Sequence, residues 1–88
     1  MYHYMTLADE TEIVHSHLIT DGDCRKVIVH FERPTEEGFD SARCELPEYK
    51  WIRVTGYSDA EVSFFDQLLH SNAHLLFKYA QNGGIHIP

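Results

Sequence analysis

The stretch SDAEVSFFDQLLHSNAHLLFKYAQN, from Ser58 to Asn82, decides the fold because it predicts one long helix with a signal at each end. Its first four residues form a capping box, in which the Ser58 hydroxyl accepts from the Glu61 amide and the Glu61 carboxylate accepts from the Ser58 amide. Asn82-Gly83-Gly84 is the matching stop, because glycine adopts the left-handed conformation after a helix without a Cβ clash. We therefore expect a C-terminal helix over Ser58–Asn82.

Upstream of this helix, short segments rich in β-branched and aromatic residues, separated by turn residues, predict an antiparallel sheet. The sequence predicts an α+β fold, an antiparallel β-meander of about four strands packed against one long C-terminal α-helix, as a single domain over residues 1–88. Tyr2–Leu7 is either an edge strand or an unpaired terminus, and Ile85–Pro88 is a tail or a short further strand. The four expected strands are Glu12–Thr20, Arg25–Arg33, Phe39–Leu46 and Tyr49–Thr55.

The first hairpin has a predicted register. Asp21-Gly22 is the preferred pair for a two-residue type I′ turn, although Asp23 leaves a longer loop open. The two-residue loop places Val14 opposite Val29, and a slip of one residue would exchange the two faces of one strand. The expected core face carries Val14, Leu18, Val27, Val29 and Phe31, and the opposite face carries Ile13, His15, His17, Ile28 and His30.

The predicted helix has more apolar surface than one sheet can cover. Its apolar arc is roughly 220°, against the roughly 100° that a single buried face requires. Uncovered apolar patches of this kind commonly mark interfaces, and a homodimer is the simplest partner. The alternative is that Tyr2, Tyr4 and Phe39 of the same chain close over the helix. The residues expected at the interface are Phe64, Leu68, Leu75 and Tyr79.

Charge narrows the classes of partner. The 88 residues include 14 acidic residues and 7 Lys plus Arg, which gives a formal net charge of −7. Direct binding to nucleic acid requires clustered cations, and an anionic membrane surface would repel this chain. No apolar run approaches the ~20 residues that span a bilayer. A basic protein partner, a role as an acidic nucleic-acid mimic, and plain solubility all remain compatible with this charge.

The two cysteines indicate a compartment. Cys24 and Cys44 are too few for a disulfide framework and fit reduced, partly buried thiols. The start Met1-Tyr-His-Tyr-Met5 lacks the basic residues and the apolar core of a signal peptide. We therefore expect the protein in the cytoplasm.

Seven histidines are the one chemically suggestive excess in the composition. In the predicted register, His15, His17 and His30 share a face, and three imidazoles so placed would bind Zn²⁺ with one position open for water. A solvated histidine face is the competing interpretation. His70 and His74 have chelating spacing on the helix, but Ser71 stands where zinc proteases carry glutamate, so we expect both to be exposed.

Nothing else in the sequence specifies catalysis. Neither cysteine lies in a nucleophile elbow, no phosphate-binding glycine motif occurs, and Trp51 is expected in the core. Strands followed by Gly56-Tyr-Ser-Asp-Ala-Glu61 and a long helix resemble small bacterial domains of unknown function, a likeness of layout that implies no catalytic residue. We expect a small, acidic, non-enzymatic protein-interaction module that self-associates through its C-terminal helix. The alternatives are a zinc-binding protein or metal-dependent enzyme that uses the strand histidines, and an acidic nucleic-acid mimic.

Overall fold

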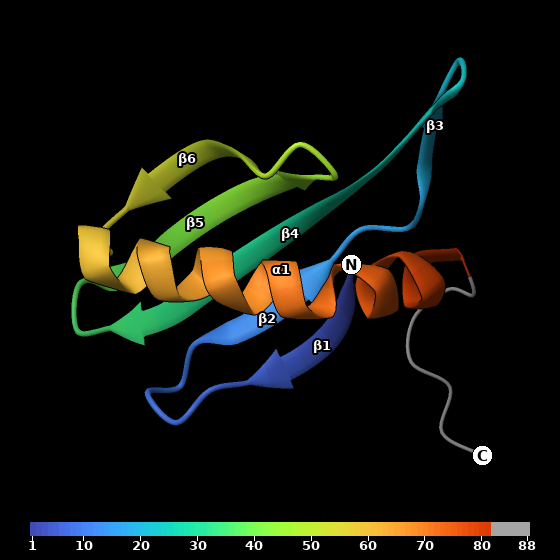
Figure 1. Cartoon of the computed structure of the whole chain (residues 1–88). Helices are drawn as coiled ribbons and strands as arrows, with labels where there is room; N and C mark the ends of the chain where they lie inside the picture. The colour runs from blue at the N-terminus through green and yellow to red at the C-terminus, as the bar shows by residue number, and fades with distance from the viewer. Residues whose placement is uncertain (82–88) are drawn as a thin grey trace.

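The computed structural model describes residues 1–81, in which six strands precede one helix (Figure 1). The strands are antiparallel, and the chain runs through them before it crosses back as the helix. The α+β class predicted from the sequence is confirmed, although the sheet has six strands rather than about four. The elements are β1 (Tyr2–Thr6), β2 (Glu12–His15), β3 (Ile19–Asp21), β4 (Cys24–Thr35), β5 (Gly38–Leu46), β6 (Lys50–Thr55) and α1 (Asp59–Gln81).

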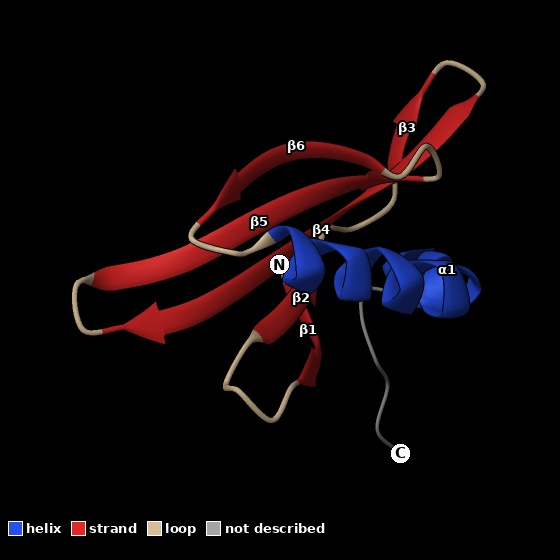
Figure 2. Cartoon of the chain, turned by 60° about the vertical axis from the view of Figure 1, so that its left-hand side comes forward, coloured by secondary structure: helices blue, strands red, loops and turns tan. Residues whose placement is uncertain are grey.

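The strands lie in the spatial order β1-β2-β4-β5-β6, and β3 pairs with the first residues of β4. Helix α1 crosses one face of this sheet, as Figures 1 and 2 show from two directions. The hairpin of β3 and the start of β4 projects away from the helix and from the rest of the sheet. The sheet therefore has one face covered by α1 and an opposite face, which we call the open face.

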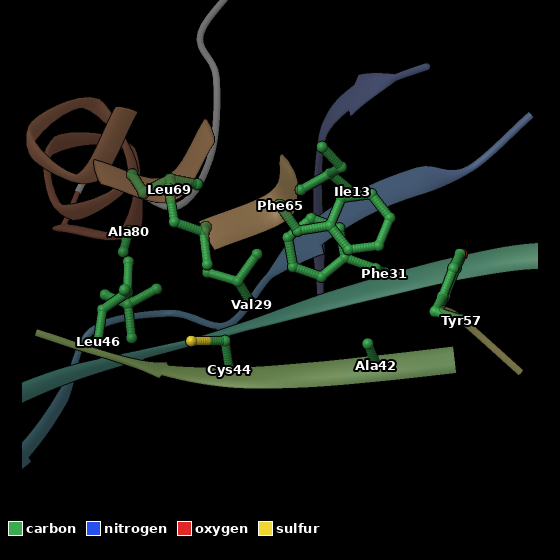
Figure 3. Close-up of a cluster of buried hydrophobic side chains, with 12 residues drawn as sticks. Ile13, Val29, Phe31, Ala42, Cys44, Leu46, Tyr57, Phe65, Leu69 and Ala80 are labelled. Carbon is green, nitrogen blue, oxygen red and sulfur yellow. The ribbon is translucent and has the colours of Figure 1, made fainter. Parts of the chain in front are cut away.

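The core lies between α1 and the covered face of the sheet (Figure 3). The ring of Phe31 stacks on that of Phe65 with centroids 4.3 Å apart, and the Tyr57 ring meets Phe65 edge-on at 5.0 Å. Alternate residues of β4 and β5 point toward the helix, as the period of two requires. Trp51 is half-buried with its ring 5.6 Å from that of Phe31, in keeping with the core position expected from the sequence.

The start of α1 matches the predicted capping box. The Glu61 amide donates to the Ser58 hydroxyl over 3.2 Å, and the Ser58 amide donates to the Glu61 carboxylate over 3.0 Å. The helix begins at Asp59, one residue after the predicted start, because Ser58 is the cap itself. The predicted stop at Asn82-Gly83-Gly84 and the predicted tail or strand at Ile85–Pro88 lie outside the described residues.

The predicted register of the first hairpin is wrong by one residue at β2. The structure pairs His15, not Val14, with Val29, and Val14 pairs with His30. As a result Ile13 and His15 face the helix, 1% and 0% exposed, whereas Val14 lies on the open face. The turn of the hairpin is also displaced, because Asp21 pairs with Cys24 around Gly22-Asp23.

A break at Ser16 explains the difference. The amide and hydroxyl of Ser16 both contact the backbone of Ile28, at 2.9 and 3.0 Å, and the Leu18 amide then donates to the Ala80 carbonyl of α1 at 3.3 Å. Three residues from Ser16 to Leu18 consequently lie opposite two residues of β4, as in a β-bulge. The predicted strand Glu12–Thr20 is therefore two strands, β2 and β3.

Candidate functional site

An apolar groove of about 570 Å³ lies between the β1–β2 turn and the first turns of α1. We call it the α1 groove. Its volume is within the range of ligand and partner pockets in proteins. Phe64 on its rim is 52% exposed, which is unusual for a phenylalanine in so small a protein. The lining residues are Leu7, Ala8, Asp9, Ala60, Glu61, Phe64 and Phe65.

One wall of the groove is the β1–β2 turn, whose backbone is held by hydrogen bonds of its own. The Leu7 amide donates to the Thr11 carbonyl at 2.8 Å, and the Glu10 amide donates to the Leu7 carbonyl at 3.0 Å. The Asp9 carboxylate accepts from the Thr11 amide at 3.0 Å, as aspartate commonly does in turns. These bonds present Leu7 and Ala8 toward the helix as a fixed surface.

Arg33 joins the two walls of the groove to the sheet. One of its terminal nitrogens donates to Asp9 at 3.0 Å and to Glu61 at 2.6 Å, so the turn and the helix meet on one guanidinium. Its remaining nitrogens donate to Asp40 of β5 at 3.0 and 2.7 Å, and the guanidinium lies 4.7 Å above the Tyr57 ring. Three carboxylates and one aromatic ring therefore surround a single cation. We call this group the Arg33 cluster.

The electrostatics of the Arg33 cluster follow from these hydrogen bonds. The amide of Thr11, assisted by Arg33, lowers the pKa of Asp9. The amide of Ser58, again assisted by Arg33, lowers the pKa of Glu61. The three carboxylates in turn raise the pKa of Arg33, with Asp40 contributing most. The hydrogen bonds of one cation to three carboxylates therefore brace the two walls of the groove against the sheet.

The four predicted interface residues lie along one side of α1 and differ in their cover. Phe64 is exposed at the α1 groove, and Leu75 is half-buried. Leu68 is half-buried against the core. The half-buried Tyr79 ring lies 6.1 Å from that of Tyr4 in β1. Cover from the same chain is thus partial and is greatest away from Phe64.

Of the residues that could cover the helix from the same chain, Tyr4 does so in part. The Tyr4 hydroxyl donates to the Asn72 side chain at 2.7 Å, which fixes β1 against the middle of α1. Phe39 does not contribute, because it is 68% exposed and alternates with Asp40, so that it projects from the open face. The uncovered part of the helix is its beginning, at the α1 groove.

The structure does not bring the three predicted metal ligands together. His15 faces the helix, His30 lies on the open face, and His17 is exposed outside both strands. No group of three potential metal-binding side chains is present among residues 1–81. His70 and His74 are exposed as expected, and the His70 ring stacks on Tyr49 with centroids 3.7 Å apart.

The two cysteines are free thiols in different surroundings. Cys24 is exposed in the β3–β4 hairpin. Cys44 is buried in the core, and burial together with the nearby Asp66 and Glu45 raises the pKa of its thiol to about 12. A thiol with so high a pKa is protonated at neutral pH and is a poor nucleophile.

Sequence reasoning missed most of the groove and all of the Arg33 cluster. One signal was available. Arg33 continues the alternation of Val27, Val29 and Phe31 on the covered face, and a cation at an inward-facing position requires carboxylate partners. The neighbouring sequence does not reveal which carboxylates these are, because they lie 7, 24 and 28 residues away in the chain.

Residues 1–81 contain the helix α1, and this helix has no apolar stretch long enough to cross a bilayer. No family model, no curated protein and no solved structure matches this chain.

Proposed function

We propose that this protein is a small, non-enzymatic interaction module that self-associates through the beginning of α1. In this proposal two copies form a symmetric dimer in which Phe64 of each copy enters the α1 groove of the other. The observation that carries it is the half-exposed Phe64 on the rim of an apolar groove of about 570 Å³. A patch with these properties commonly marks an interface.

A second copy is favoured as the occupant because the surface is complementary to itself. A symmetric dimer brings the same patch of both copies together, so a projecting group must find its recess on that same patch. Phe64 supplies the projection, and Leu7, Ala8 and Ala60 line the recess beside it. Burying one phenylalanine contributes about 1.5–3 kcal/mol, and a two-fold axis supplies this contribution twice.

The rest of the helix side supports a contact longer than one residue. Leu75 and Tyr79 are half-buried by their own chain, so each retains apolar surface for a partner. Leu68 lies between Phe64 and Leu75 along the same side, by the spacing of three to four residues that places residues on one helix face. The Arg33 cluster favours a pre-formed surface, because it fixes both walls of the groove before a partner arrives.

A reducing compartment fits this role. Cys24 is an exposed free thiol, and an oxidising environment would expose it to cross-linking between copies. We therefore place the protein in the cytoplasm as part of the proposal.

The test is the mass of the protein in solution, measured by sedimentation equilibrium over a range of concentrations. Wild type is expected to dimerise, and Phe64→Ser is expected to weaken the dimer at least about tenfold, which corresponds to ~1.4 kcal/mol. Phe39→Ser is the matched control, since it removes another exposed phenylalanine, 68% exposed, from the open face. Phe39→Ser should leave the dissociation constant of the dimer unchanged.

Two outcomes would overturn the proposal. One is a wild-type protein that stays monomeric up to ~1 mM, because a dissociation constant above that value is too weak for a specific dimer. The other is an equal loss of dimer in the two variants, which would show that any exposed phenylalanine promotes association. Circular dichroism on both variants separates loss of the contact from loss of the fold.

A further inference from the structure

Two arginines stand side by side on the open face of the sheet. Arg43 of β5 pairs directly with Arg53 of β6, and His30 of β4 pairs with Arg43 on the other side. Directly paired residues of antiparallel strands point to the same face, with Cβ atoms ~4.5–5.5 Å apart. A shallow polar pocket of about 110 Å³ lies at this point, and its lining residues are His30, Glu32, Ser41, Ala42, Arg43 and Arg53.

The placement of these arginines is unfavourable for the free protein. Like charges that face each other across two strands destabilise a sheet. Over residues 1–81, the side chains of Arg43 and Arg53 make no ion pair or hydrogen bond, whereas the side chain of Arg33 engages three carboxylates. The chain has 14 acidic residues for 7 Lys plus Arg, so carboxylate partners are plentiful. An anion between the two guanidiniums would remove the repulsion.

The pocket offers donors from more than one direction. Each guanidinium presents a planar fork of N–H groups, and the Ser41 hydroxyl is a further donor in the next row of the sheet. Burial lowers the pKa of His30, and the positive charge of Arg43 lowers it further. His30 is therefore neutral near pH 7 and can donate one ring N–H.

We propose that Arg43, Arg53 and Ser41 bind a single phosphate-class oxyanion on the open face of the sheet. A planar carboxylate is satisfied by the fork of one arginine, whereas a tetrahedral oxyanion accepts hydrogen bonds in several directions at once. The pocket has about the volume of four water molecules, at ~30 Å³ each, which suits one such group. The site is on the opposite face from the α1 groove, so it does not depend on the proposed dimer.

Glu32 tunes this site and provides a sharp control. Glu32 is a lining residue of the pocket, and its negative charge offsets part of the positive charge of the two arginines. Binding by the wild type is therefore weak, with a dissociation constant of about 1 mM. Glu32→Gln removes the repulsion of the anion while keeping the shape of the side chain. It should bind phosphate about threefold to tenfold more tightly than wild type.

The experiment is an NMR titration with inorganic phosphate at constant ionic strength, which follows the arginine Nε–H signals. Wild type should show a saturating shift at Arg43 and Arg53, and Arg53→Met should weaken binding about tenfold or more. Arg25→Met, at an exposed arginine in the β3–β4 hairpin, is the matched control and should bind as wild type. The backbone spectra report that each variant is folded.

Three results would overturn this assignment. The first is the absence of a saturating shift up to ~50 mM phosphate, far above the expected dissociation constant. The second is the same affinity in Arg53→Met as in wild type. The third is equal binding of acetate, which would make the site a general carboxylate contact instead of a phosphate site.

Discussion

At the scale of single residues, His15 has the most unusual surroundings. It is fully buried, with the rings of Tyr2 and Tyr4 at 5.6 and 6.4 Å. Its Nδ1 lies 2.8 Å from the Ser16 carbonyl oxygen, so the tautomer with the proton on Nδ1 donates a hydrogen bond there. Its Nε2 has no hydrogen-bond partner among the described residues. A protonated imidazole in this place would leave a charged N–H without an acceptor. Burial accordingly lowers the pKa of His15.

We predict that His15 makes the protein less stable as the medium becomes acidic. The pKa of His15 in the folded state lies below that of the unfolded chain, ~6.5, so the unfolded state takes up a proton first as pH falls. Stability is present above pH ~6.5 and declines from there toward the folded pKa, by at most about 1.4 kcal/mol per pH unit. His15→Leu should show a shallower decline between pH 7 and 5 in urea unfolding. An unchanged decline would show that His15 is not its source.

The candidate site was predictable only where a residue's role depends on its neighbours in sequence. The exposure of Phe64 was predictable because the helical period turns it about 100° from the buried Phe65, whereas its place in an interface stays a prediction. The histidine hypothesis depended on the register of β2, and one residue of slip moves His15 to the covered face. Arg33 could not be assigned its partners, because they come from three separate parts of the chain.

At the scale of elements, a feature was predicted accurately when the residues that form it lie close together in the sequence. Helix α1 was predicted to within a residue at its start, since its capping box uses only Ser58 and Glu61. The break between β2 and β3 was missed, because it is caused by contacts of Ser16 with β4 and of Leu18 with the end of α1. Such contacts exist only once the sheet and the helix have assembled.

The turn from β6 into α1 gives a prediction about backbone geometry. Gly56 has a φ of 87°, and a Cβ at this position would overlap the Asp40 carboxylate that holds Arg33. Gly56→Ala should therefore destabilise the protein by about 2–4 kcal/mol in urea unfolding, through strain and a disturbed Arg33 cluster. Gly22→Ala is the matched control, with a φ of 63° but open space around it, and should cost about 1 kcal/mol. An equal loss of unfolding free energy in the two variants would mean that the contact with Asp40 does not contribute to the effect of Gly56→Ala.

At the scale of the whole molecule, the two proposed surfaces lie on opposite sides of one thin layer. The α1 groove is on the helix side, and the arginine pocket is on the open face. The net charge of −7 acts on both, because it repels a second copy as well as an approaching anion. Screening by salt weakens the repulsion between two copies, so it should favour self-association. At the pocket the arginines are the nearest charges to the anion, so there screening should mainly weaken their attraction for phosphate.

The salt dependence of self-association is the prediction at this scale. Two copies of net charge −7 repel each other, while the proposed contact is apolar. Raising NaCl from ~50 to ~500 mM shortens the screening length from roughly 14 to 4 Å and should tighten the dimer several-fold in sedimentation equilibrium. A dimer that weakens with added salt would instead be held by ion pairs, contrary to the proposed contact.

The β3–β4 hairpin, which projects away from the helix and the rest of the sheet, has a practical consequence. Its exposed Cys24 is open to an alkylating reagent, whereas the second thiol, Cys44, is shielded by the core and stays protonated with a pKa of about 12. A maleimide dye should therefore attach at one place without mutagenesis. The native chain thus carries its own handle for fluorescence, remote from the groove, with which the meeting of two copies can be watched directly.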